Sequence, residues 1–182
     1  INLPKTLFVH GFITVNGQKM SKSLGNIIDP FKQIEKFGLE AVRFYLLKEV
    51  IDSDDGDYSE ERLMEVINSE LADDLGNLVR RITVLIEKNF SGIIPTQGKL
   101  EKVDKEFIKK SRFAKEFDEL MLSFKFNKAI ELIWDFIRAI NKYLTETEPW
   151  KIKDHKRLGT ILFNALEATR IIALYLSLII PD

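Results

Sequence analysis

From Ser59 to Ile180 the sequence repeats apolar residues at helical spacing, and this pattern restricts the chain to a mainly helical fold. Ser59 is a suitable N-cap, and the two glutamates that follow it suit the positive end of a helix dipole. The interruption around Pro95 also contains two glycines, which predicts a loop. We therefore expect a bundle of four or five helices. The expected helices cover about 59–89 with a bend near 73–76, 104–122, 126–145 and 155–180.

The N-terminal third has a different pattern. Residues 6–21 read as strand with a turn, because the Asn16-Gly17 dipeptide suits the positive φ angles of a tight hairpin turn. An Asp-Pro pair at Asp29 predicts the start of a helix, and Gly38 predicts its end. A second helix follows.

The acidic stretch IDSDDGDYS, residues 51–59, predicts a solvated turn. A calcium loop is disfavoured, because the distal glutamate of an EF-hand that starts at Asp52 would fall on Leu63. The fold class is therefore mainly α. A small α/β element over residues 1–58 precedes an α-helical bundle over residues 59–182.

Composition excludes several classes of site and partner. The net charge of −1 is unlike that of a nonspecific nucleic-acid binder, so any nucleic-acid contact is expected to be local and specific. Without cysteine there is neither a disulfide nor a thiolate metal site, and with two histidines we expect no bound metal. The most apolar run, IIALYLSLII, has ten residues, too few for a bilayer core of about 30 Å. We expect a buried helix there and no membrane partner.

Both ends of the sequence suggest a piece of a longer protein. The chain begins at Ile1 without a signal-peptide pattern, and it stops directly after the apolar helix. The cytoplasm is the default location, and a mitochondrial one stays open. The sequence does not indicate an oligomeric state.

The stretch NGQKMSKSLGN, residues 16–26, has the composition of a phosphate-binding loop. It contains Lys19 and Lys22, two serines and two glycines, and it has no acidic residue. It does not match the usual phosphate loop, in which Gly-Lys-Ser/Thr follows a glycine and four further residues. Lysine ammonium groups are compact charges that stabilise a phosphate leaving group, and a glycine here allows the loop to close.

The pentad Lys19, Met20, Ser21, Lys22 and Ser23 resembles the signature loop of class I aminoacyl-tRNA synthetases. The flanking stretches FVHGFITVNGQ and LGNIIDPFKQIEKFGLEAVRFYLL are similar to the methionyl-tRNA synthetase family, as are ADDLGNLVRRI and KYLTETEPWK further on. The resemblance covers essentially the whole chain. It implies that Lys22 is the main contact to the ATP phosphates, that Lys19 assists, and that Met20 packs the loop inward. The serines add hydrogen bonds.

A second set of polar residues lies on one predicted helix. Asn77 and Arg81 are four residues apart and therefore share a helix face. Both side chains are suited to the edges of unpaired RNA bases. The resemblance implies that this pair reads the anticodon CAU of tRNA(Met), with Arg80 as a nearby phosphate contact.

The two tryptophans have opposite expectations. Trp150 follows a proline in a predicted loop, where a tryptophan can stack on a base, and the resemblance assigns it to the anticodon. Trp134 has isoleucines at helical spacing and is expected in the core. Two roles are open for His10: one near the nucleotide and one that is structural. His155 is expected to be a surface residue.

The resemblance implies ATP, as MgATP, and methionine as substrates of the complete enzyme, and tRNA(Met) as its partner. No His-x-Gly-His motif occurs in the sequence, so we expect the isolated chain to be inactive in methionine activation. The alternatives are a non-catalytic tRNA-binding module derived from such an enzyme, or another class I synthetase, such as that for cysteine, valine or leucine. A purely structural bundle would leave these motifs unexplained.

Overall fold

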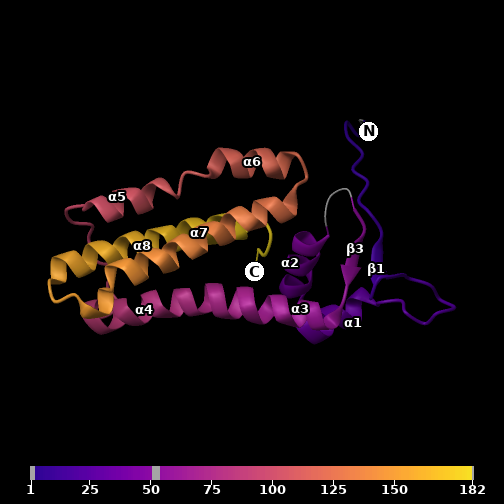
Figure 1. Ribbon diagram of the computed structural model, residues 1–182, viewed down its shortest axis with the longest axis horizontal. Coiled ribbons are helices and arrows are strands. Elements are labelled where there is room, and N and C mark those ends of the chain that lie inside the picture. The colour runs from indigo at the N-terminus through magenta and orange to yellow at the C-terminus, as the bar shows by residue number, and fades with distance from the viewer. Residues whose placement is uncertain (1–2, 51–53, 182) are drawn as a thin grey trace.

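The computed structural model describes residues 3–50 and 54–181, and Figure 1 shows a small mixed element at one end of a long helical bundle. The N-terminal elements are β1 (Ile13–Val15), β2 (Gln18–Lys19), α1 (Pro30–Phe37), α2 (Leu39–Glu49) and β3 (Gly56–Tyr58). The remaining elements are α3 (Glu60–Val66), the π-helical η1 (Ile67–Gly76), α4 (Asn77–Phe90), α5 (Lys102–Lys109), α6 (Ala114–Leu122), α7 (Phe126–Thr147), the 3-10 turn η2 (Pro149–Lys151) and α8 (His155–Leu176).

The core lies around α7 and α8, which pack along each other with α4 on one side and α5 and α6 on the other (Figure 1). Trp134 of α7 is 2% exposed and packs on Phe44 of α2, with ring centroids 4.9 Å apart. This confirms the predicted core position of Trp134. The contact also ties α2 of the N-terminal element directly to the bundle.

The last helix, α8, contributes ten buried residues to the core. Among the described residues it is the one helix long and apolar enough, by length and composition alone, to cross a membrane, and half of its apolar window is buried in the fold. A core helix of a bundle has the same properties, and α8 has that position here.

Local sequence signals set the ends of the first two helices. The Asp29 carboxylate accepts a hydrogen bond from the Phe31 amide at 3.0 Å, and Pro30 occupies the first turn of α1. Gly38 ends α1 with a φ of 87° and donates its amide hydrogen to Ile34 O. Ser59 caps α3 in the same way as Asp29 caps α1, by accepting from the Arg62 amide. These predictions are confirmed.

The predicted strand over 6–21 is shorter than expected. β1 and β2 pair antiparallel across the Asn16-Gly17 turn, whose φ angles of 50° and 73° confirm the predicted hairpin. The described residues before Gly11 have no strand partner within the described chain, and most of them are exposed.

The prediction of a solvated turn over 51–59 is wrong for its second half. Residues 56–58 form β3, which pairs in parallel with β1 to complete a sheet of order β2-β1-β3. Tyr58 is buried and its hydroxyl donates to Gln33 Oε1 at 2.7 Å, so burial of this side chain and pairing with β1 outweigh the acidic composition. Asp52, the first residue of the disfavoured calcium loop, lies outside the described residues.

The predicted helix over 104–122 is two helices. Residues 110–113 leave the helix although they include neither glycine nor proline. Phe113 turns inward instead, with its ring 5.4 Å from that of Phe136 and 5.0 Å from that of Tyr175. The aromatic packing ends α5 and starts α6, a long-range effect that local propensity does not report.

The predicted bend near 73–76 is absent from the described helix, and the π-helical segment η1 takes its place. α3, η1 and α4 form one continuous rod (Figure 1), and Gly76 keeps helical angles of −61° and −46°. The change is in the hydrogen bonds, since the Asn77 amide donates to Ala72 O, five residues back. Ile67, Leu71 and Leu75, which pack against the core, are spaced by four, and a turn slightly wider than 3.6 residues keeps them on one side.

Candidate functional site

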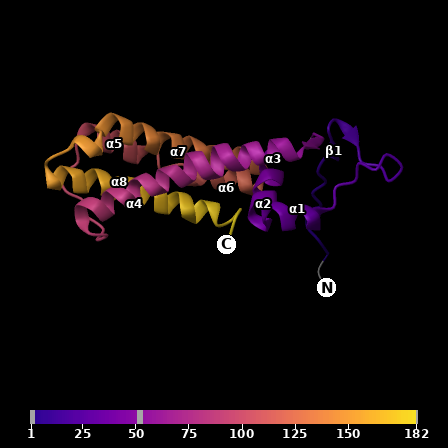
Figure 2. The same ribbon diagram turned by 90° about the horizontal axis from the view of Figure 1, so that it is seen from below.

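The lysine loop projects from the end of the molecule opposite the turn between α7 and α8, as both views show (Figures 1 and 2). It leaves the sheet at β2 and returns at α1. Asn26 closes its base: the Ser21 amide donates to Asn26 Oδ1 at 2.8 Å, and Asn26 Nδ2 donates to Lys19 O at 3.2 Å. A turn at the tip is held by the Gly25 amide, which donates to Lys22 O at 3.3 Å.

The two lysines of the loop have different surroundings. The Lys19 ammonium lies 4.9 Å from the centre of the Phe12 ring, so a cation–π contact holds it near the sheet. Lys22 is exposed, and its ammonium has neither a hydrogen bond nor an ion pair within the described residues. The Ser21 and Ser23 hydroxyls are 2.8 Å apart, and Met20 is half-buried. The loop therefore presents one restrained cation and one available cation.

Sequence reasoning missed two residues that shape this loop. The sequence pattern does not single out Asn26, whose side chain joins the Ser21 amide to Lys19 O. Asp57 was placed in the solvated turn, but its Oδ1 accepts from the Gly17 amide at 2.8 Å and from Thr14 Oγ1 at 2.7 Å. An acidic residue alternating with buried ones in GDY was the only available signal for Asp57.

The predicted pair on α4 shares one exposed face, because the buried residues of this turn are Leu78 and Ile82. Asn77 Nδ2 donates to Asp73 Oδ1 at 3.3 Å, one turn earlier. Arg81 Nη2 donates to Asn141 Oδ1 at 3.3 Å, which links α4 to α7. Both contacts are exposed and long, so they orient the side chains while leaving donors for a ligand.

Trp150 lies in η2, the turn that follows α7, and 50% of it is exposed. Its neighbour Pro149 is buried, and Glu148 adopts a left-handed φ of 42° that starts the turn. The turn is anchored through Pro149 and offers the indole to solvent. α7 thus carries Asn141, the partner of Arg81, and leads within nine residues to Trp150.

A buried polar cluster lies beneath this turn. The Asp104 carboxylate is fully buried and accepts from Arg157 Nη1 at 2.5 Å, Arg157 Nη2 at 3.1 Å, Tyr143 Oη at 2.6 Å and the Glu101 amide at 2.7 Å. Burial acts to raise the pKa of Asp104, but these hydrogen bonds together outweigh it and lower that pKa. Asn164 Nδ2 also donates to Tyr143 Oη at 3.2 Å. The cluster fixes α5, α7 and α8 around the Trp150 turn.

The pKa of Tyr143 shifts in the opposite direction to that of Asp104. Desolvation and the hydrogen bond to Asp104 both favour the neutral phenol and raise its pKa. The cluster therefore contains one carboxylate, one guanidinium and one neutral phenol. Among the described residues, no group of three or more histidine, aspartate or glutamate side chains is arranged to hold a metal ion.

The structure keeps the two predicted sets apart. The loop over residues 16–26, which carries both lysines, is at one end of the molecule, whereas the turn between α7 and α8 is at the other (Figure 1). Asn77 and Arg81 lie on the rod that joins the two ends. His10 is exposed, and His155 is an exposed residue that packs on Phe90 with ring centroids 4.2 Å apart.

Three comparisons with known proteins agree on one family. A family model for class I tRNA synthetases (M) matches residues 1–83. The chain is 46% identical to a methionine–tRNA ligase of Thermotoga maritima, over 99% of this chain and 29% of that protein. It is 43% identical to the ligase of Clostridium acetobutylicum over the same shares. Over nearly its whole length the chain is similar to class I methionyl-tRNA synthetases.

The fold agrees with that relationship. Mycobacterium tuberculosis methionyl-tRNA synthetase in complex with methionyl-adenylate superposes with a TM-score of 0.94 and 35% identity, over 100% of this chain and 37% of that one. Its ligand-free form superposes with a TM-score of 0.88. The chain thus spans less than a third of the length of these curated ligases and little more than a third of the solved synthetases.

Proposed function

We propose that this chain is the C-terminal part of a methionine–tRNA ligase, which activates methionine with ATP and attaches it to tRNA(Met). Residues 1–58 supply the lysine loop at the edge of the catalytic domain, and residues 59–182 form the anticodon-binding domain. The observation that carries the proposal is the 46% identity to such a ligase over nearly the whole chain. The cytoplasm is the expected location.

The loop suits a role in activation. In the reaction the methionine carboxylate attacks the α-phosphorus of MgATP, and the bond from this phosphorus to pyrophosphate breaks. The adenylyl group is transferred to methionine, and negative charge grows on the pyrophosphate leaving group. Lys22 is exposed in this loop, and its ammonium group can stabilise the charge on the leaving group when the loop closes over the nucleotide. Lys19, Met20, Ser21 and Ser23 complete this ATP-binding loop. Lys19 starts from a restrained position against the Phe12 ring.

The other end suits an RNA loop. Asn77 and Arg81 offer hydrogen-bond donors on one exposed helix face, and Trp150 offers a flat aromatic surface on an anchored turn. Unpaired bases are recognised by this combination of edge contacts and stacking. We assign the three residues to the CAU anticodon of tRNA(Met).

Binding of RNA stem-loops to the chain tests this assignment. We expect a stem-loop with CAU to bind more tightly than one with a changed first or second anticodon base, by about 10-fold or more, since a good paired contact discriminates by about 1–3 kcal/mol. Asn77→Ala, Arg81→Ala and Trp150→Ala should each reduce that ratio. Equal affinity of the unmodified chain for all anticodons would reject the role of these residues.

Activation by the isolated chain is a separate test. The chain has no His-x-Gly-His motif, so we expect no methionine-dependent exchange of pyrophosphate into ATP. Detectable exchange, above that of a Lys22→Ala control, would show that the chain holds a complete activation site.

A further inference from the structure

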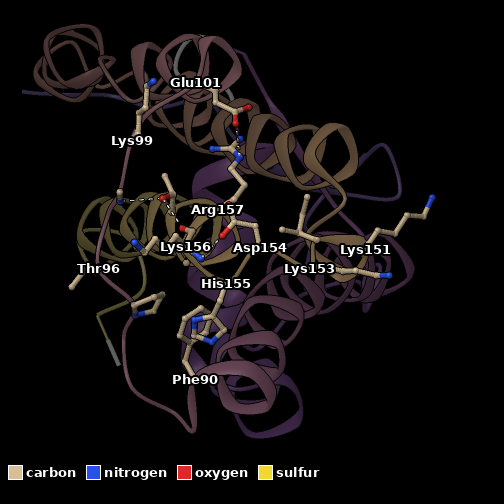
Figure 3. Close-up of a pocket in the computed structure, with 15 residues that line it drawn as sticks. Phe90, Thr96, Lys99, Glu101, Lys151, Lys153, Asp154, His155, Lys156 and Arg157 are labelled. Atoms are coloured by element: carbon tan, nitrogen blue, oxygen red, sulfur yellow. Dashed lines mark hydrogen bonds and ion pairs between the residues drawn. The ribbon is translucent and has the colours of Figure 1, made fainter.

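A cavity of about 1080 Å³ opens beneath the turn that carries Trp150 (Figure 3). One wall is the loop between α4 and α5, with Pro95, Gly98 and Lys99. The opposite wall is the stretch from Lys151 to Asp154, directly after Trp150, and the floor is the first turns of α8. None of the predicted site residues lines this cavity.

The walls are held in place without a ligand. The Gly98 amide donates to Thr160 Oγ1 at 3.0 Å, and Gln97 Nε2 donates to Asn164 Oδ1 at 2.6 Å. Gly159 lets the loop approach α8, because a Cβ there would lie 3.2 Å from the Pro95 side chain and 3.4 Å from that of Phe90. The cavity is therefore a preformed feature that needs little ordering on binding.

Six basic side chains line the cavity or its rim, and their pairing separates them into two groups. Arg157 is neutralised by Asp104, and Glu101 lies 3.3 Å from its Nε, while Lys151 pairs with Glu148 at 2.7 Å. Lys99, Lys153 and Lys156 have no ion-pair partner within the described ranges 3–50 and 54–181, and His155 contacts Asn89 O at 3.0 Å. The unpaired positive charge consequently comes from three exposed lysines. The Asp154 carboxylate, which caps α8 by accepting from the Lys156 amide at 2.9 Å, lines the same cavity.

The three lysines belong to three separate segments: the α4–α5 loop, the α7–α8 turn and the first turn of α8. Figure 3 shows Lys99 and Lys153 on opposite sides of Arg157. A single phosphate would need converging cations, whereas this spread suits several phosphates along a chain.

We propose that this cavity binds the sugar–phosphate backbone of the RNA loop whose bases meet Trp150, with Lys99, Lys153 and Lys156 as the phosphate contacts. The proposal rests on the proposed function, since it takes RNA as the partner of this end of the bundle. An RNA backbone is favoured over an acidic peptide because a half-exposed tryptophan on an anchored turn stands beside the lysines, and stacked bases place their phosphates next to such a surface.

The test measures salt-dependent binding of a CAU stem-loop to the chain and to a variant with Lys99→Ala, Lys153→Ala and Lys156→Ala. The control variant carries Lys109→Ala, Lys110→Ala and Lys128→Ala, which removes the same charge from exposed lysines outside the cavity lining. Circular dichroism and thermal melting confirm that both variants are folded.

The expected change follows from counterion release. Each lost contact to a single-stranded phosphate lowers the slope of log K against log salt by about 0.7, so three contacts lower it by about 2. Between about 50 mM and 200 mM salt, the unmodified chain should lose roughly 20-fold more affinity than the cavity variant. The control variant should keep the slope of the unmodified chain, and the cavity variant should keep the preference for CAU.

The outcomes separate this proposal from the proposed function. A cavity variant with an unchanged slope and intact CAU preference overturns the phosphate site and leaves anticodon reading in place. If the unmodified chain binds CAU and changed anticodon stem-loops with equal affinity, anticodon reading itself is rejected. Displacement of the RNA by low millimolar inorganic phosphate would point to a single anion site, and equal salt-dependent binding of polyglutamate would point to an acidic protein; either result overturns the RNA assignment.

Discussion

Replacing Asp104 with Asn removes the negative charge from the cluster that holds α5, α7 and α8 together beneath the Trp150 turn. The side chain is fully buried, and its two oxygens accept four hydrogen bonds. In Asp104→Asn one oxygen becomes an NH₂ donor. Two of the donors that now point at the carboxylate would then face another donor.

The magnitude follows from those contacts. Hydrogen bonds to a charged group contribute about 1.5–3 kcal/mol each, and removing one partner of a buried ion pair costs about 3–5 kcal/mol. Arg157 keeps Glu101 as a second partner at 3.3 Å, and its side chain is 14% exposed, which limits the penalty. We expect a loss of about 3 kcal/mol at pH 7, a large share of the 5–15 kcal/mol typical of a domain.

Urea unfolding followed by circular dichroism measures this loss, with Glu101→Gln as the control. Glu101 is 61% exposed, so breaking its pair with Arg157 should cost less than about 1 kcal/mol. The pKa of Asp104 is lower in the folded chain than in the unfolded one. Its stabilisation is therefore complete above the unfolded pKa of about 3.9 and is lost as pH falls through the folded value.

The difference in unfolding free energy between the unmodified chain and Asp104→Asn should thus be constant from pH 7 to about pH 5 and narrow below about pH 4. A loss under about 1 kcal/mol at pH 7 would refute the reasoning, because it would mean that the buried carboxylate contributes no more than a surface pair. A gap that widens in acid would contradict the direction of the pKa change.

Two further predictions concern the lysine loop. In a longer enzyme that contains this chain, Lys22→Ala should lower the rate of methionine activation, measured by pyrophosphate exchange, about 100-fold or more, because contacts to transition-state charge are worth several kcal/mol. The affinity for tRNA, measured by filter binding, should stay within about 2-fold. A large loss of tRNA affinity with normal activation would reverse the assignment. Asn26→Ala removes the two hydrogen bonds of this side chain to the Ser21 amide and Lys19 O, so proteolysis within residues 19–26 should become faster. The melting temperature should stay within about 2 °C of that of the unmodified chain. An unchanged cleavage rate there would show that these hydrogen bonds do not hold the loop.

The helices that the sequence predicted correctly are those whose ends are set by neighbouring residues. Asp29 and Gly38 define the ends of α1 through their own backbone and side-chain geometry, so the local sequence was sufficient to predict this helix. The Asn16-Gly17 turn is the same kind of signal. Trp134 could be assigned to the core because its apolar neighbours recur on one helix face.

The errors arose where distant contacts compete with local preference. β3 forms at an acidic segment because β1, more than forty residues earlier, offers unpaired backbone groups. The α5–α6 break forms because Phe113 packs on aromatic rings of α7 and α8. Neither partner can be identified from the residues around the break or the strand.

For the candidate sites, the residue types and their local spacing could be identified from the amino-acid sequence: the lysine loop, the Asn77 and Arg81 face, and the tryptophan after proline. The family resemblance attached roles to them. Tertiary structure decided what surrounds them, because only folding brings Asn141 to Arg81 and gathers the buried Asp104 cluster. It also places three lysines from separate segments around one cavity, and electrostatic interactions depend on distance in space, which the order of residues in the chain does not fix.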